Sequence, residues 1–105
     1  MVTGFNQALN LISIAAKAGK VASGGFLCEK ALSDGSARLV LIAEDASANT
    51  CKRFIDKCTY YDVPYKVIGD KDLLGHRIGK EFRTVLAITD EGLANQIALK
   101  LELEV

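Results

Sequence analysis

The 105-residue sequence has no apolar stretch long enough to cross a bilayer. Its longest uninterrupted apolar run, Leu39 to Ala43, has the length of one strand, whereas a membrane-spanning helix needs about 20 apolar residues. The segment from Met1 to Phe5 also lacks the basic-then-apolar layout of a signal peptide. We therefore expect a cytoplasmic protein that has no membrane as a partner.

Cysteine is scarce, with three residues and no CxxC pair. An odd number without close pairs argues against both a disulfide framework and a zinc site. Cys51 and Cys58 lie seven residues apart on an expected helix, which separates them by roughly 10 Å and puts them beyond disulfide reach. We expect these two cysteines and Cys28 to fill apolar space.

A net charge of either sign is absent as well, because 13 basic residues balance 13 acidic ones. The net charge of the chain therefore does not indicate a nucleic-acid partner. The charges are distributed unevenly, however, since residues 1–89 hold 12 bases and 9 acids. The remaining acids are all close to the C-terminus, with only Lys100 among them: Asp90, Glu91, Glu102 and Glu104. The pattern fits either a basic working face with an acidic tail or ordinary scatter.

Helical and strand patterns alternate along the whole chain. Apolar residues recur at helical spacing in residues 5–19, 27–35, 49–61 and 91–102, and a short helix fits between Gly69 and Gly79. Strands are expected at residues 21–23, 39–43, 65–68 and 84–89, and the unbroken apolar ones should be buried on both faces. The sequence predicts a single α/β domain over residues 1–105, a three-layer α/β/α sandwich with a mixed sheet of about four strands.

The helical patterns also predict which side chains face the core. In the second helix Leu27 shares a stripe with Ala31, beside Cys28 and Leu32, so we expect it to be buried. Phe26, about a third of a turn away, should be at least partly exposed. In the third helix the expected inner face consists of Cys51, Phe54, Ile55, Cys58 and Tyr61.

A short acidic and polar stretch follows the first strongly apolar strand. Adjacent carboxylates such as Glu44 and Asp45 can bind Mg²⁺ or serve as acid and base. No second acidic cluster or metal-binding spacing accompanies them, and neighbouring residues at a strand end point to opposite sides. Asp45, Ser47 or Asn49 can instead cap the following helix. We therefore predict helix entry and loop shaping here, with no catalytic residue, metal site or cofactor.

Two other candidate motifs carry little chemistry. His76 is the only histidine, and no serine or cysteine lies in a nucleophile-elbow pattern, so we expect a surface or half-buried side chain. Gly19-Lys20 is not a P-loop, because Val21 stands where Ser or Thr is needed. Ser23-Gly24-Gly25 opens a helix, however, and its bare backbone amides can bind a phosphate.

Five ordered motifs resemble a known family: AKAGKVASG at residues 16–24, ARLVLIAEDAS at 37–47, VPY at 63–65, LGHRIGK at 74–80 and RTVLAITD at 83–90. Together they resemble the ribosomal protein L7Ae/L30e superfamily over nearly the whole chain. Within that superfamily, the sequence is most similar to the small bacterial YlxQ-like branch of ribosomal-type proteins.

The resemblance implies an RNA-binding α/β/α sandwich that typically recognises kink-turn RNA without a cofactor. Three segments meet the RNA in that family, and here they correspond to residues 23–30, 44–47 and 78–83. The implied partner is structured RNA, ribosomal RNA included. The protein itself is expected to be a monomer that has no small-molecule substrate. The expected RNA-binding residues are Lys20, Ser23, Gly24, Gly25, Phe26, Lys30, Glu44, Asp45, Ser47, Gly79, Lys80, Phe82 and Arg83.

The sequence departs from the family at the start of the second helix. Kink-turn binders commonly carry Gly-x-Asn-Glu, with a lysine three residues after the glutamate. Gly24 and Lys30 match, but Phe26 and Leu27 replace the two polar side chains that read the sheared G·A pairs. RNA binding therefore stays the leading hypothesis without a defined kink-turn specificity.

Two alternatives remain open at this point. The first is a protein-interaction module on the same fold that has lost RNA binding and makes contacts through an exposed Phe26 or Phe82. The second is a small enzyme that uses Glu44 and Asp45. Salt-sensitive RNA affinity favours the RNA-binding hypothesis, salt-resistant partner binding favours the module, and metal-dependent turnover favours the enzyme.

Overall fold

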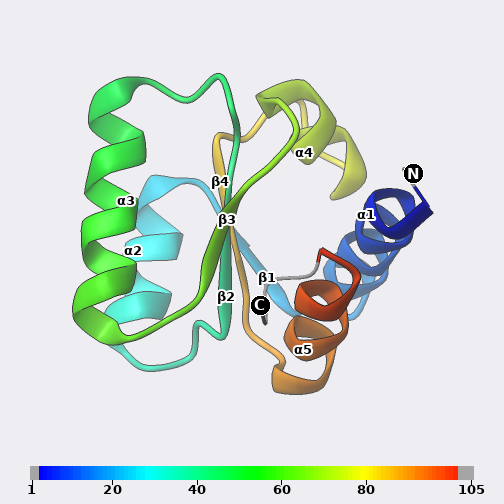
Figure 1. The fold of residues 1–105 in the computed structure, drawn as a ribbon, viewed down its shortest axis with the longest axis horizontal. Coiled ribbons are helices and arrows are strands. Elements are labelled where there is room, and N and C mark those ends of the chain that lie inside the picture. The colour runs from blue at the N-terminus through cyan, green and yellow to red at the C-terminus, as the bar shows by residue number, and fades with distance from the viewer. Residues whose placement is uncertain (1–2, 102–105) are drawn as a thin grey trace.

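Helices and strands alternate in the computed structural model, which describes residues 3–101 (Figure 1). Their bounds, in chain order, are α1 (Thr3–Lys17), β1 (Val21–Ser23), α2 (Gly25–Ser33), β2 (Leu39–Ile42), α3 (Ala48–Tyr61), β3 (Tyr65–Val67), α4 (Lys71–Arg77), β4 (Val85–Ile88) and α5 (Glu91–Lys100). All the elements predicted from the sequence are present. The expected end of the last helix at residue 102 and the acidic tail residues Glu102 and Glu104 lie outside the described residues.

The four strands form one mixed sheet in the order β1-β4-β2-β3. β4 is antiparallel to both of its neighbours, β1 and β2, whereas β2 and β3 are parallel. The parallel pair is joined through α3, as a parallel connection requires a crossover rather than a hairpin. The predicted mixed sheet of four strands is confirmed.

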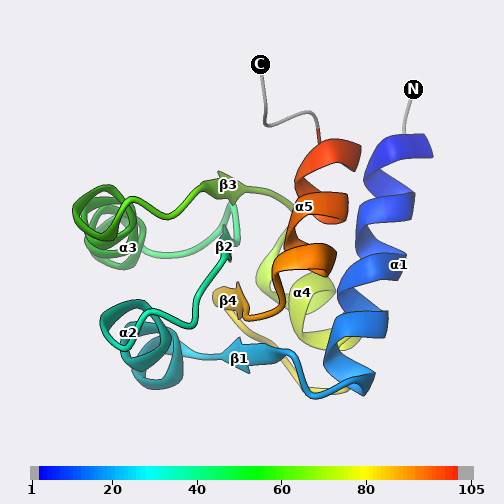
Figure 2. The ribbon, with the colours of Figure 1, turned by 90° about the horizontal axis from the view of Figure 1, so that it is seen from below.

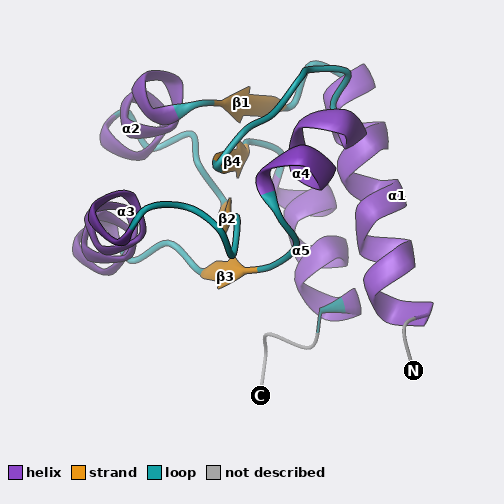
Figure 3. Ribbon diagram, turned by 90° about the horizontal axis from the view of Figure 1, so that it is seen from above, coloured by secondary structure: helices purple, strands orange, loops and turns teal. Residues whose placement is uncertain are grey.

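Helices cover both faces of this sheet. α2 and α3 lie on one face, and α1, α4 and α5 lie on the other (Figures 2 and 3). The two central strands, β2 and β4, are fully buried, which explains why their sequences are apolar without alternation. The predicted three-layer sandwich is therefore confirmed.

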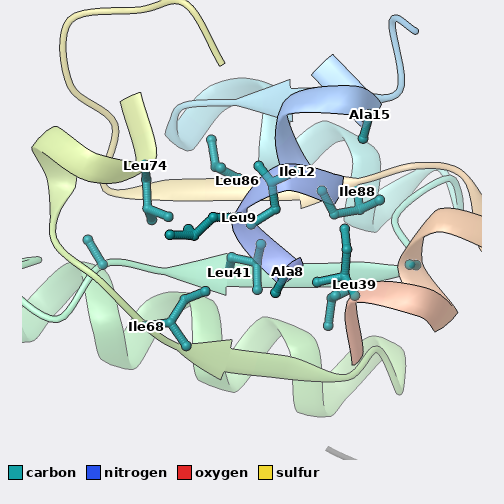
Figure 4. Packing of buried hydrophobic residues seen from close by; sticks show 13 residues of the cluster. Ala8, Leu9, Ile12, Ala15, Leu39, Leu41, Ile68, Leu74, Leu86 and Ile88 are labelled. Carbon is teal, nitrogen blue, oxygen red and sulfur yellow. The ribbon is translucent and has the colours of Figure 1, made fainter. Parts of the chain in front are cut away.

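The two faces of the sheet form separate halves of the core. Leu39 and Leu41 of β2 point to the same side as Leu86 and Ile88 of β4, where they meet side chains of α1 and α4 (Figure 4). The alternate residues of the same strands pack against α2 and α3, around Phe54. This arrangement follows from the two-residue period of a strand.

Two side chains expected in the core are exposed, so those predictions were wrong. Leu27 is 48% exposed because it belongs to the first turn of α2, where the helix lines an open groove with Phe82 instead of covering the sheet. Tyr61 is 38% exposed, because it is the last residue of α3 and lies at the rim, edge-on to the ring of Tyr60. Phe26 is 79% exposed, as expected from its position beside Leu27.

The cysteines have the predicted structural character. Cys28 and Cys58 are buried and Cys51 is half-buried, and all three are free thiols. Burial raises the pKa of the Cys28 thiol to about 12 and that of Cys58 to about 11. Within residues 3–101, none of the helices has the length and apolar character needed to cross a membrane.

Candidate functional site

Three loops converge at one end of the sheet. β4 runs antiparallel to β1 and β2, so the residues that enter β4 lie beside those that leave the other two strands (Figure 1). The amide of Gly24 donates to the carbonyl of Val85 over 3.0 Å, and the amide of Ala43 donates to the carbonyl of Thr84 over 2.8 Å. The topology therefore brings together the three segments that the family resemblance indicated, residues 23–30, 44–47 and 78–83.

Hydrogen bonds connect these segments through the start of α4. The Oδ1 of Asp45 accepts from the amide of Lys71 over 2.9 Å, and the carbonyl of Lys71 accepts from the amide of Arg83 over 3.0 Å. The side chain of Arg83 then donates from Nε to the Oγ of Ser23 over 3.2 Å and from Nη1 to the carbonyl of Phe82. A continuous polar chain thus runs from the exit of β2 to the exit of β1.

In the acidic pair after β2, Asp45 makes a structural contact through its carboxylate and Glu44 makes one through its backbone. Asp45 joins Asp70, whose carboxylate accepts from the amide of Leu73 over 2.8 Å, in satisfying the free amides at the start of α4. The backbone amide of Glu44 donates to the carbonyl of Gly69 over 2.7 Å. Ser47 is the cap of α3, accepting from the amide of Thr50 over 3.1 Å, which decides between the three capping candidates.

Gly75 fixes the position of the loop that enters β4. It is buried in α4, and a Cβ there would lie 2.5 Å from the Cα of Phe82 and 2.9 Å from the carbonyl carbon of Glu81. The absence of a side chain therefore allows the backbone of the loop to rest directly on α4. The Nζ of Lys71 lies 5.5 Å above the ring of Phe82, within cation–π range.

Aromatic and basic side chains line the groove where the three loops meet. This helix-start groove, of about 390 Å³, is lined by Ser23, Gly24, Gly25, Phe26, Leu27, Phe82, Arg83 and Thr84. Phe82 is 52% exposed, so the rings of both Phe26 and Phe82 are open to solvent on the walls of this groove. The amides that begin α2 have no side-chain cap, in contrast to those of α3, α4 and α5. The groove therefore combines free amide donors with flat apolar surfaces.

A second groove adjoins the first through Arg83. This loop groove, of about 630 Å³, is lined by His76, Gly79, Lys80, Glu81 and Arg83. Lys80 is exposed and has no carboxylate within 4 Å among residues 3–101. His76 is exposed, as expected for a surface histidine. The loop groove thus offers two cations beside one carboxylate.

Two of the expected cations lie away from these grooves. Lys20 precedes β1, and its carbonyl accepts from the amide of Thr89 beyond the far end of β4, about 10 Å along the strand from Ser23. Lys30 lies on the flank of α2 that faces α3. The remaining expected residues line one of the two grooves, except for three that follow β2: Glu44, Asp45 and Ser47.

Sequence reasoning missed two basic residues near the grooves. Lys71 contacts Phe82 from α4, and Arg53 approaches the start of α2, since a Cβ on Gly25 would lie 3.0 Å from its Nη2. The Nε of Arg53 also pairs with Glu29 at 3.1 Å. No local sequence signal marks either residue, because both reach the site through tertiary packing.

Comparison with known proteins identifies the family. The sequence profile of the ribosomal protein L7Ae/L30e/S12e/Gadd45 family matches residues 6–98. The chain belongs to this family. The resemblance seen in the five sequence motifs is thereby confirmed.

Relatives and solved structures agree with this assignment. The chain is 48% identical over 92 residues to the RNA-binding protein YlxQ of Bacillus subtilis, covering 88% of this chain and 92% of the relative. It is 38% identical over 90 residues to the RNA-binding protein YlxQ of Enterococcus faecium, covering 86% of each. A Bacillus halodurans protein of unknown function superposes with a TM-score of 0.88 at 35% identity, over 90% of this chain and 96% of that one. The Giardia lamblia 15.5kD RNA binding protein superposes with a TM-score of 0.79 at 28% identity, over 90% and 82%.

Proposed function

We propose that this family member is a non-catalytic RNA-binding protein that binds structured RNA, ribosome-associated RNA included. In this proposal residues 1–105 act as one ribosomal-protein-like domain, monomeric and cytoplasmic, without a cofactor or a small-molecule substrate. The RNA lies across the helix-start groove and the loop groove. The names of the YlxQ relatives, which are RNA-binding proteins, support this assignment.

The convergence of the three loops is the observation that carries the proposal. Phe26 and Phe82 expose flat rings on which unpaired bases can stack. Lys80 and Arg83 supply positive charge for phosphates on the adjoining groove, and the uncapped amides of α2 add donors at the end of a helix dipole. Aromatic faces next to cations and free amides suit RNA better than a small apolar ligand.

The test is an RNA titration at several salt concentrations. Lys80→Ala combined with Arg83→Ala should weaken binding to a bulged stem–loop RNA and flatten the salt dependence by about one unit of slope per lost phosphate contact. Lys17→Ala is the matched control, because Lys17 is exposed on α1 and lines neither groove. An unchanged slope in the double variant, or an equal loss in the control, contradicts the proposed face.

The preference for a kink-turn is a separate question. Phe26 and Leu27 are both exposed at the family's base-reading position and have no hydrogen-bonding side-chain groups. We therefore expect a standard kink-turn to bind no better than a bulged RNA whose G·A pairs have been replaced. If the kink-turn binds tighter by tenfold, about 1.4 kcal/mol, another group reads the G·A pairs.

A protein-interaction module is the second candidate, favoured by the exposure of Phe26, Leu27 and Phe82 in one groove. Such a module binds through burial of apolar surface, so its affinity for a partner should survive 1 M salt, whereas RNA affinity falls steeply with salt. A partner that stays bound in 1 M salt after ribonuclease treatment, and is lost in Phe26→Ala, would favour this candidate.

A further inference from the structure

A third groove, which the three family segments form only in part, runs between α2 and α3. This interhelix groove, of about 420 Å³, is lined by Phe26, Glu29, Lys30, Ser33, Lys57 and Tyr61. Phe26 also lines the helix-start groove, so its exposed ring forms a wall shared by both. The proposed RNA surface therefore continues around the start of α2 without a break.

The charges in the interhelix groove favour a polyanion. Lys57 is half-buried on α3 and has no carboxylate within 4 Å among the described residues. The carboxylate of Glu29, the only acidic group in the lining, is paired with Arg53. Lys30 lies 3.8 Å from Asp34, but both side chains are largely exposed, and such pairs are weak. The two lysines are thus available to phosphates.

Aromatic rings stand at both ends of this groove. Phe26 begins it and Tyr61 closes it beside Ser33, about 10 Å farther along α2. The ring of Tyr61 is held edge-on by Tyr60, with centroids 4.8 Å apart. Since stacked nucleotides repeat every ~3.4 Å along one strand, the length suits two or three unpaired nucleotides.

We propose that the interhelix groove binds a short single-stranded RNA segment that flanks the structured site, with bases stacked on Phe26 and Tyr61 and phosphates on Lys30 and Lys57. This inference rests on the proposed RNA-binding function and extends it to Lys57 and Tyr61 of α3, which lie outside the family segments. Alternating aromatic and cationic groups are how proteins hold single strands without reading their sequence.

The test compares a bulged stem–loop RNA alone with the same RNA carrying six uridines at its 5′ or its 3′ end, measured by fluorescence anisotropy at low salt. One extension should tighten binding at least tenfold. Tyr61→Ala and Lys57→Gln should each remove most of that gain while changing the affinity for the unextended RNA less than twofold. Tyr61→Phe, which keeps the ring, should keep the gain.

Lys52→Gln is the matched control, because Lys52 is an exposed lysine of the same helix that lies outside the groove. If neither extension tightens binding, or if the gain survives in Tyr61→Ala, the inference is wrong although the proposed function stands. If the unextended RNA does not bind at all, the proposed function fails and this inference fails with it. An acidic peptide that binds the wild type but not Tyr61→Ala, without any effect of the uridines, would assign the groove to a protein partner instead.

Discussion

Gly75→Ala is expected to move the loop that enters β4 without unfolding the domain, because Gly75 lies where this loop packs on α4. A Cβ at this position would lie 2.5 Å from the Cα and 2.8 Å from the amide nitrogen of Phe82. Ordinary contacts begin at about 3.4 Å, so the loop backbone must move by about 1 Å. Backbone cannot rotate away as a flexible side chain can. The movement therefore shifts both Phe82 and Arg83.

The size of the effect follows from two opposing contributions. Alanine is more favourable than glycine inside a helix by about 1 kcal/mol. Forcing an extra carbon into a packed site costs about 1–3 kcal/mol. The free energy of unfolding should therefore fall by between about 0 and 2 kcal/mol, which leaves the chain folded. The loss in RNA-binding free energy should exceed the loss in unfolding free energy, because Arg83 loses its alignment with Ser23 and Phe82 loses its place in the groove.

Urea unfolding and RNA titration of the same samples check this expectation. Gly92→Ala is the matched control, because Gly92 is also helical and a Cβ there meets only the Oδ2 of Asp90, at 3.4 Å. The control should gain up to about 1 kcal/mol of stability and bind RNA like the wild type. If Gly75→Ala is as stable as Gly92→Ala and binds RNA equally well, the loop does not depend on this contact and the reasoning is refuted.

Asp45→Ala should lower the free energy of unfolding by about 1 kcal/mol in urea, because it removes the acceptor of the Lys71 amide, whereas Asp45→Asn should lose less than half of that. Neither Mg²⁺ nor Mn²⁺ should give a saturable calorimetric isotherm with RNA-free protein, and an isotherm that vanishes in Asp45→Asn would show the structural role to be wrong. Ser47→Ala should cost about 1 kcal/mol as a lost cap of α3. The buried thiols hold their protons to a higher pH than unfolded thiols, whose pKa is 9.0, so stability should fall as pH rises from about 9 to 12. The free energy of unfolding of Cys58→Ala, measured by urea titration under reducing conditions, should fall less steeply between pH 8 and 10 than that of the wild type. Identical slopes contradict the assignment of this pH dependence to the buried thiols.

The fold could be predicted because local signals and burial agree along most of the chain. The unbroken apolar sequences of β2 and β4 demand helices on both faces, and those helices have amphipathic patterns of their own. The prediction failed at helix ends. Leu27 and Tyr61 satisfy the periodicity of their helices. The first turn of α2 and the last residue of α3 lie at groove rims, however, where a side chain on the inner face of the helix has no core to pack against.

The site was predictable only in part, for a related reason. The motifs located the three loops, but nothing in the sequence says that Asp45 bonds to Lys71 or that Arg53 approaches Gly25. Those contacts join residues that are 26 and 28 positions apart, and they follow from strand order rather than from spacing. Lys20 is an example of the opposite error. Its closeness in sequence to Ser23 suggested a shared surface, but the two residues lie at opposite ends of β1.

The chemistry of the helix-start groove limits how it can recognise an RNA. Phe26, Leu27 and Phe82 contribute no side-chain donors or acceptors, and Arg83 already bonds to Ser23 and to the carbonyl of Phe82. The groups that remain are backbone amides, the hydroxyl groups of Ser23 and Thr84, the cations nearby and the faces of the rings. Phosphates and base faces are common to every nucleotide, so cations that bind phosphates and rings that stack on bases do not distinguish one base from another. In the proposed function, these contacts therefore favour an RNA by its shape: a bend or bulge that presents an unpaired base to the rings and a backbone turn to the start of α2.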